Sequence, residues 1–244
     1  NGESWDHTAT QQIIIADLTI NGAPRHVVMQ APKNGFFYVI DAATGKLISA
    51  KNFTDVAWAT HIDMATGRPV ENPAARFNVT GENFLSTHIP NGAHTWHSMS
   101  FSPLTKLVYF PIHGTPFIYG AAKEYTTTAM ATNLGTDFSG NAALDPQEVL
   151  AQTYGRLIAW DPVKQEEVWR VERAGPANGG ALATAGGLVF QGTGSGQFTA
   201  MDATTGAELW STHAQTGIIA APMSYMLDGE QYVAILAGTG GSWA

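Results

Sequence analysis

Two histidines, His94 and His97, lie three residues apart and suggest a metal site, because imidazole nitrogens are common zinc ligands. A zinc site needs at least three protein ligands, and no third candidate lies nearby in the sequence. The spacing therefore does not favour zinc. The run Gly192–Gly196 resembles a phosphate-binding loop, but no Lys-Ser or Lys-Thr follows to open a helix. We interpret this run as a hairpin turn.

Asp6 and Lys33 carry the other chemically useful groups. The carboxylate of Asp6 could act as a general base or bind a hard cation, and the ammonium of Lys33 could stabilise a developing negative charge. The residue types by themselves favour plainer roles. Aspartate is a common turn residue, and lysine is most often solvated at the surface.

The composition indicates a turn-rich β protein as the framework for these residues. Only 13% of the 244 residues are charged, 44% are hydrophobic and 26 are glycine. The net charge of -8 argues against a nucleic-acid partner, which requires a basic face. Cysteine is absent, so disulfides and thiolate metal sites are excluded. No apolar run approaches the ~20 residues of a transmembrane helix.

A repeated segment indicates the architecture. Its pattern, Ala-x-Asp-x-x-Thr-Gly-x-x-x-Trp, is clearest at Ala200–Trp210. The repeat aspartates are Asp41, Asp161 and Asp202. Asp161 and Asp202 are 41 residues apart. Asp41 and Asp161 are 120 residues apart, which is close to three repeats of 41 residues. A period of roughly 40–45 residues is typical of a four-stranded β-propeller blade.

Each repeat predicts a hairpin. An apolar strand runs into the aspartate, which can close a turn on its own backbone, and the glycine tolerates positive φ. The second strand ends in Trp169 or Trp210, which we expect to wedge between neighbouring blades. The repeat is degenerate, because Ser49 takes the tryptophan position in the first copy and Gln165 takes the glycine position in the second.

Three further strand pairs fit the same scheme, since Asp-Gly and Gly-Gly between apolar segments favour hairpins. They join residues 25–30 to 36–40, 182–183 to 188–191, and 225–227 to 231–236. The stretches 55–91 and 115–154 are rich in Thr, Asn, Gly and Pro, and we interpret them as long insertions. A short helix is expected at Asp145–Ala151, where Asp-Pro opens an apolar run.

Five motifs, in order, resemble quinoprotein alcohol dehydrogenases: Trp5–Gln11, Ala31–Asp41, Gly92–Pro103, Asn178–Thr193 and Ala221–Tyr225. The resemblance implies an all-β, eight-bladed β-propeller of four-stranded antiparallel blades with tryptophan-docking motifs. It also implies the cofactors pyrroloquinoline quinone (PQQ) and Ca²⁺ and a periplasmic location. The chain resembles only the second half of these proteins. We therefore expect residues 1–244 to form a partial propeller, about half of the ring.

The resemblance implies roles for Asp6 and Lys33. Asp6 takes the position of the catalytic aspartate, which removes the hydroxyl proton while hydride leaves carbon for the quinone, and which also binds Ca²⁺. Lys33 takes the position of a cation that meets the quinone, stabilises the reduced cofactor and orients the aspartate.

Cofactor contacts are implied for three more residues. Thr95 and Trp96 stand where relatives often have Asn-Trp facing the cofactor edge, although a core role explains Trp96 almost as well. Asn178 follows Ala177 where many relatives have Trp-Asn, and the alanine is expected to open the cavity to bulkier substrates. Thr239–Gly241 resembles a glycine-rich end near the cofactor, and a tight turn explains it equally well.

The resemblance also implies partners. The glutamate and asparagine that complete the calcium site, and a vicinal cysteine pair, would precede Asn1, and the strand that closes the ring would follow Ala244. The missing initial methionine predicts processing or truncation. We therefore expect the remaining half of the propeller, as a separate chain or as a missing segment. The other expected partners are an alcohol substrate and an electron acceptor, either a cytochrome c or a quinone-linked one. We expect no nucleic-acid partner and no transmembrane segment.

Two functions from different classes stay open. The first is PQQ- and calcium-dependent oxidation of primary alcohols, with sugars or polyols as further substrates. The second is a non-catalytic propeller that serves as a binding or assembly scaffold in the bacterial envelope. The presence of Trp5-Asp6 and of Lys33 favours the dehydrogenase, since a scaffold needs neither. The sequence does not distinguish among alcohols or sugars.

Overall fold

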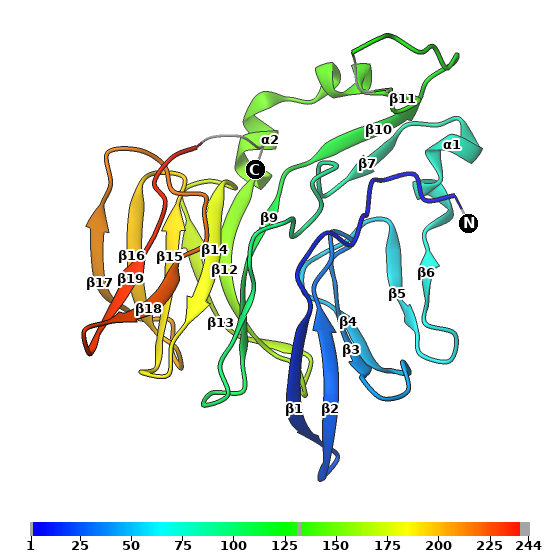
Figure 1. Cartoon of the computed structure of the whole chain (residues 1–244). Helices are drawn as coiled ribbons and strands as arrows, with labels where there is room; N and C mark the ends of the chain where they lie inside the picture. Colours follow the sequence, from blue (N-terminus) through cyan, green and yellow to red (C-terminus); the bar gives the residue numbers. More distant parts are fainter. Residues whose placement is uncertain (1, 131–132, 240–244) are drawn as a thin grey trace.

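The computed structural model describes residues 2–130 and 133–239, and strands dominate it (Figure 1). Three four-stranded antiparallel sheets form its body, and Figure 1 shows them side by side in chain order. Their strand orders are β1-β2-β3-β4, β13-β12-β9-β8 and β14-β15-β16-β17. This arrangement contains the four-stranded blades that the repeat predicts. The turns at Asp41 and Asp161 lie in neighbouring blades, so their spacing of 120 residues reflects two long insertions and not three blade units.

The bounds of the strands follow the chain closely. The first sheet comprises β1 (Ile14–Ile20), β2 (Ala23–Gln30), β3 (Phe36–Asp41) and β4 (Leu47–Asn52). The second comprises β8 (Ser100–Phe101), β9 (Val108–Gly114), β12 (Tyr154–Asp161) and β13 (Glu166–Arg173). The third comprises β14 (Asn178–Ala183), β15 (Leu188–Thr193), β16 (Gln197–Asp202) and β17 (Glu208–His213). A separate hairpin joins β18 (Met223–Leu227) to β19 (Glu230–Ala234).

The repeat turns form as their sequence predicts. The Asp202 side chain accepts hydrogen bonds from the backbone N–H groups of Thr204 and Thr205, both at 2.9 Å, and Asp41 caps its turn in the same way. These hydrogen bonds hold the pKa of Asp202 below its ordinary value, because they stabilise the carboxylate. Gln165, at the expected glycine position, still adopts a left-handed φ of 58°. The three further hairpins predicted from the sequence are also present.

The core lies between the sheets, and the tryptophan prediction holds for Trp169. Its ring is 8% exposed, packs with Tyr109 at 5.6 Å between centroids, and donates from Nε1 to the Ala203 carbonyl of the next sheet at 3.1 Å. Trp210 is 50% exposed, because no described segment covers the β17 face of the third sheet. Thus Trp169 wedges between two blades, whereas Trp210 presents its ring outward.

The two long stretches, the first between two blades and the second between β9 and β12 of one blade, contain short elements. The first carries the hairpin of β5 (Ala59–Asp63) and β6 (Arg68–Glu71), the 3₁₀ helix η1 (Pro73–Ala75), α1 (Phe77–Thr80) and β7 (Phe84–Ser86). The second carries β10 (Phe117–Ala121), β11 (Thr136–Asp137), the 3₁₀ helix η2 (Ser139–Ala143) and α2 (Pro146–Gln152). The predicted short helix is confirmed as α2, with Asp145 as its N-cap. Strands β11, β10 and β7 form a sheet above the blades in Figure 1.

Candidate functional site

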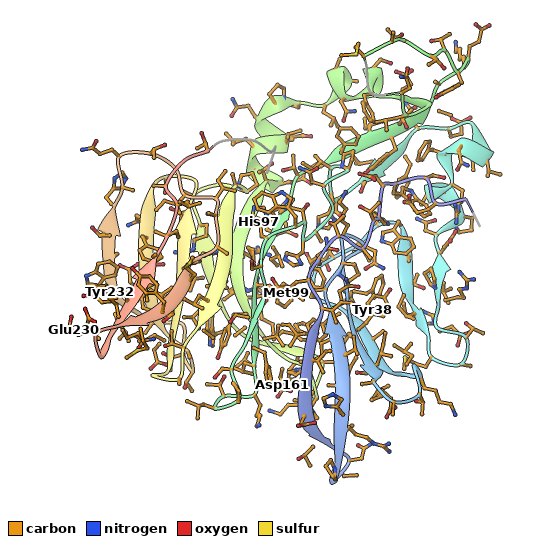
Figure 2. All side chains as sticks on the ribbon, viewed as in Figure 1. Tyr38, His97, Met99, Asp161, Glu230 and Tyr232 are labelled. Atoms are coloured by element: carbon orange, nitrogen blue, oxygen red, sulfur yellow. The ribbon has the colours of Figure 1, made fainter. Side chains whose placement is uncertain are left out.

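The predicted site residues gather at one end of the sheets. Asp6, Thr95 and Trp96 precede the first strand of a blade, β1 or β8, and Asn178 opens the first strand of the third blade, β14. Lys33 follows β2, and the end of β2 pairs with the start of β1. Two backbone hydrogen bonds join these segments: Ala93 N–H to the Lys33 carbonyl at 3.0 Å, and Ala181 N–H to the Ser98 carbonyl at 2.9 Å. Figure 2 shows His97 toward this end, whereas Asp161, in a repeat turn, lies toward the other.

Asp6 and Lys33 form an ion pair. Lys33 Nζ donates to Asp6 Oδ2 at 2.8 Å across 27 residues of sequence. The Lys33 side chain is only 9% exposed, whereas that of Asp6 is 54% exposed. No other hydrogen bond to the Asp6 carboxylate is found within residues 2–130 and 133–239. The pair therefore presents a carboxylate with one oxygen held by a buried cation and the other oxygen open to a ligand.

The backbone at Asp6 is held in an uncommon conformation. Its φ is 62°, in the left-handed region that costs an ordinary residue about 1–2 kcal/mol. Glu3 stabilises this conformation, because its Oε1 accepts from the backbone N–H groups of Trp5 at 2.6 Å and His7 at 3.0 Å. The carboxylate of Glu3 thus holds the backbone on either side of Asp6.

Trp5 anchors this segment to the insertion layer. Its Nε1 donates to the Ala75 carbonyl of η1 at 2.9 Å, and its own carbonyl accepts from the Tyr119 hydroxyl at 3.2 Å. The guanidinium of Arg76 lies 4.6 Å from the centre of the Trp5 ring, within reach of a cation–π interaction. Burial and the nearby carboxylates of Glu3 and Asp6 raise the pKa of Tyr119 above its ordinary value. Its hydroxyl therefore stays protonated and donates to Trp5.

Lys33 is positioned by the segment that leads to Thr95 and Trp96. Gly92 and Ala93 lie directly against the Lys33 backbone. The buried His94 ring bridges two carbonyl oxygens, with Nδ1 2.6 Å from Ala31 and Nε2 2.9 Å from His97. A neutral imidazole donates to only one of them. Both ring nitrogens of His94 thus contact backbone carbonyls, and they join the segment before Lys33 to the loop before β8.

Thr95, Trp96 and Asn178 occupy different environments. Thr95 is buried, whereas Trp96 is 43% exposed and stacks on His97 with 4.2 Å between ring centroids. Trp96 therefore offers an open aromatic face at this end of the blades rather than filling the core. Asn178 is buried and donates to the Gly175 carbonyl at 2.7 Å. No described hydrogen bond links Asn178 to Asp6 or Lys33. Of the Thr239–Gly241 motif, residues 240 and 241 lie outside the described residues.

A cavity of about 450 Å³ lies beside the ion pair, lined by Trp5 and His7 on either side of Asp6 and by Asn34 next to Lys33. The rings of Trp5, His7 and Trp58 contact one another with 5.0–5.5 Å between centroids. Burial, and next the charge of Lys33, lower the pKa of His7 to about 4. The His7 ring next to Asp6 is thus neutral at neutral pH, and the acidic and basic side chains of Glu3, Glu71, Arg68 and Arg76 complete the lining.

Sequence reasoning overlooked several residues that shape this site. Glu3 matters because its carboxylate accepts from the backbone N–H groups of Trp5 and His7, and His7 matters because its ring contacts Trp58. No local pattern signals either role. Gly92 does carry a signal, because Asn-Gly marks a turn. Within the described residues, no group of three or more His, Cys, Asp or Glu side chains is arranged to hold a metal ion. Any cation at Asp6 would therefore need further ligands from elsewhere.

Comparison with known proteins identifies the family. The sequence profile of the family "PQQ: Glucose/ethanol/alcohol dehydrogenase, beta-propeller domain" matches residues 78–233, more than half of the chain. The chain belongs to this family of PQQ alcohol dehydrogenase propellers. Its blades are accordingly part of such a propeller, as the repeat and the ordered motifs predict.

Individual relatives match almost the whole chain. It is 52% identical to quinohemoprotein alcohol dehydrogenase ADH IIB of Pseudomonas putida, over 98% of this chain and 34% of that protein. It is 46% identical to 1-butanol dehydrogenase (cytochrome c) of Thauera butanivorans, over 98% of this chain and 35% of that protein. The solved structure of ADHIIG from Pseudomonas putida superposes with a TM-score of 0.90 at 44% identity, over 97% of this chain and 35% of that one.

The chain thus spans about a third of the length of the relatives that it matches. The rest of a propeller of this family has no counterpart in the 244 residues. In the part of the chain that the structure describes, no helix is both long and apolar enough to cross a membrane.

Proposed function

We propose that this chain forms part of a PQQ- and calcium-dependent dehydrogenase that oxidises alcohols to aldehydes or ketones, with primary alcohols as its main substrates and sugars or polyols as further ones. The observation that carries the proposal is the ion pair of Asp6 and Lys33. A half-exposed carboxylate held by a buried ammonium, beside a cavity with an aromatic wall of Trp5, His7 and Trp58, is suited to deprotonating an alcohol.

Asp6 acts as the general base. Its open oxygen takes the hydroxyl proton of the alcohol, while Lys33 keeps the other oxygen in place at 2.8 Å. The aromatic rings of Trp5, His7 and Trp58 offer a surface on which the carbon skeleton of the substrate packs. A base of this kind contributes typically 10²–10⁴-fold to the rate.

The donor set fits PQQ, a planar quinone that carries carboxylates. Lys33 provides a buried cation, Trp96 an aromatic face that is 43% exposed, and Thr95 and Asn178 polar groups at the same end of the blades. When bound, PQQ accepts the two electrons that leave the carbinol carbon. Lys33 then stabilises the added negative charge, because it is desolvated and already in place.

Calcium fits Asp6 as one oxygen ligand among several. Ca²⁺ takes six to eight oxygen ligands, and Asp6 supplies a carboxylate with an open oxygen. The remaining ligands would come from PQQ and from the part of the propeller that this chain lacks. We accordingly propose that the chain works together with that part, as a separate chain or as a continuous one. We place the assembled enzyme in the periplasm, where a cytochrome c or a quinone-linked acceptor receives its electrons.

Reconstitution tests this function. The chain is combined with the complementary part of the propeller, PQQ and Ca²⁺, and dye reduction is followed with ethanol. We expect alcohol-dependent reduction, and we expect Asp6→Asn to lower kcat/KM at least about 100-fold without loss of PQQ absorbance. Asp17→Asn is the matched control, because Asp17 lies on β1 and its exposed side chain contacts only His26 in the described residues.

Two outcomes would contradict the proposal. No dye reduction despite bound PQQ would exclude the dehydrogenase, and full activity of Asp6→Asn would exclude Asp6 as the base. Absence of PQQ binding, together with an unimpaired biological role of Asp6→Ala, would favour the alternative of a scaffold in the bacterial envelope.

A further inference from the structure

We propose that Gly92 is a positioning residue for Lys33: its lack of a side chain lets the turn before β8 rest on the Lys33 backbone and thereby fixes the ammonium against Asp6. This inference rests on the proposed function, because the consequence for activity requires Asp6 to be the base. Its structural part is independent of that function and can be measured separately.

The contact between Gly92 and Lys33 leaves no room for a side chain. A Cβ atom placed on Gly92 would lie 2.4 Å from Lys33 Cβ, 2.5 Å from the Lys33 carbonyl oxygen and 2.6 Å from Lys33 Cα. Two of these atoms belong to the backbone, so a rotamer change at Lys33 does not relieve the overlap. The φ of Gly92 is 77°, which any L-residue with a side chain adopts only with strain.

Both sides of this contact are tethered. The Gly92 N–H donates to the Ile89 carbonyl at 2.8 Å, and the next residue, Ala93, donates to the Lys33 carbonyl at 3.0 Å. Ala93 is also held from β9, because the His113 N–H donates to its carbonyl at 2.9 Å. On the Lys33 side, the preceding Ala31 carbonyl lies 2.6 Å from His94 Nδ1. A new methyl group therefore displaces a backbone that is anchored at several points.

The displacement reaches the ion pair. Moving atoms from 2.4–2.6 Å to an ordinary contact distance requires a shift of about 1 Å in the Lys33 backbone or in the turn. The Lys33 ammonium sits 2.8 Å from Asp6 Oδ2, and a 1 Å misplacement of a catalytic group can cost roughly 10²-fold in rate. We therefore expect Gly92→Ala to lower kcat/KM by about 10- to 100-fold.

A matched glycine separates the overlap from the backbone strain. Gly22, in the turn between β1 and β2, has the same φ of 77°, and no atom lies within 4 Å of a Cβ placed there. Gly22→Ala thus imposes the strain alone, and Gly92→Ala imposes the strain together with the overlap. In the reconstituted protein we expect Gly22→Ala to retain wild-type kcat/KM. Equal loss of kcat/KM in the two variants would overturn the inference.

Acetylation of Lys33 gives a readout that does not depend on activity. The Lys33 side chain is 9% exposed, so acetic anhydride should modify it slowly in the folded protein, as followed by peptide mass spectrometry. We expect the modification rate of Lys33 to rise at least tenfold in Gly92→Ala and to stay unchanged in Gly22→Ala. If Lys33 labelling changes as expected but the wild-type protein oxidises no alcohol, the proposed function fails and the positioning role of Gly92 stands.

A double-mutant cycle shows whether Gly92 acts through the Lys33 ammonium. In a Lys33→Ala background, Gly92→Ala should cause no further loss of kcat/KM. The overlap with the backbone of residue 33 remains in that background, so Gly92→Ala should still lower the unfolding midpoint. Additive losses of kcat/KM would refute the role. Should Gly92→Ala fail to fold, Gly92→Asn carries the same Cβ overlap on a residue that tolerates positive φ, and the same measurements apply.

Discussion

Replacing Trp169 should show how strongly neighbouring blades are joined. A tryptophan buries about 150–250 Å², worth roughly 4–6 kcal/mol at about 25 cal/mol per Å². The ring of Trp169 is 8% exposed and lies flat against Gly206, where an added Cβ would meet it at 2.7 Å. Alanine keeps part of that area, so we expect Trp169→Ala to lower the free energy of unfolding by about 3–5 kcal/mol.

The hydrogen bond of the indole contributes only part of this loss. Trp169 Nε1 donates to the Ala203 carbonyl at 3.1 Å, and the Tyr109 hydroxyl donates to the same oxygen at 2.9 Å. In Trp169→Phe the carbonyl keeps its second donor, so no buried acceptor is orphaned. Trp169→Phe should therefore cost only about 1–2 kcal/mol, from one hydrogen bond and the smaller ring.

Urea denaturation of the 244-residue chain, followed by far-UV circular dichroism, measures these differences. The matched control is Trp210→Ala, the same position of the next repeat, where the ring is 50% exposed. Its loss should not exceed about 2 kcal/mol, because half of the ring surface remains in water. A Trp169→Ala loss equal to or smaller than that of Trp210→Ala would refute the wedging of Trp169 between blades.

Three further outcomes are expected. Burial lowers the pKa of His113 to about 4 from an ordinary 6.5, so the unfolded chain binds more protons than the folded chain between these pH values. The free energy of unfolding should therefore fall by about 3 kcal/mol for this residue as the pH drops from about 6.5 to about 4. Urea titrations over this pH range measure the change, and a flat profile would contradict it. Ala177→Trp fills a cavity of about 190 Å³ beside Asn178. In the reconstituted enzyme it should lower kcat/KM for bulky alcohols at least tenfold more than kcat/KM for ethanol. An equal change in kcat/KM for all alcohols would argue against a substrate role of that cavity. Removal of Ca²⁺ with a chelator should abolish dye reduction and its return should restore it, whereas activity without any divalent ion would exclude a metal at Asp6.

The blades could be predicted from local pattern. The Asp-x-x-Thr-Gly turns bring their own hydrogen bonds, since Asp41 and Asp202 cap backbone N–H groups two and three residues ahead. The short helix after Asp145 likewise follows from its cap and from Pro146 at the first helical position. The hairpin of β5 and β6 was not predicted, although its turn, Asp63–Gly67, carries the Asp-x-x-Thr-Gly pattern and Asp63 accepts from the Ala65 N–H. Its strands are short, and no tryptophan follows the turn as in the later repeats.

The site could be predicted only as a set of residues. Asp6, Lys33, Thr95, Trp96 and Asn178 come from ordered motifs that resemble a known family, and nothing in the spacing of Asp6 and Lys33 shows that they meet. The distance of 2.8 Å between them, the brace from Glu3 and the overlap that Gly92 avoids arise between segments far apart in the chain. The family roles of these residues stay predictions until the experiments above are done.

By itself the sequence determined the period, the turns and the tryptophans of the repeat, because each of these depends on interactions among residues that are close in the chain. Only the tertiary structure decided how similar residues differ. Trp169 is covered by the next blade, and Trp210 is half exposed because the described residues after it supply only the hairpin of β18 and β19. Likewise Lys33 is a buried partner of Asp6 rather than a solvated turn lysine. Burial and pairing depend on which segments pack together, and that information lies in the assembly of the blades rather than in any one of them.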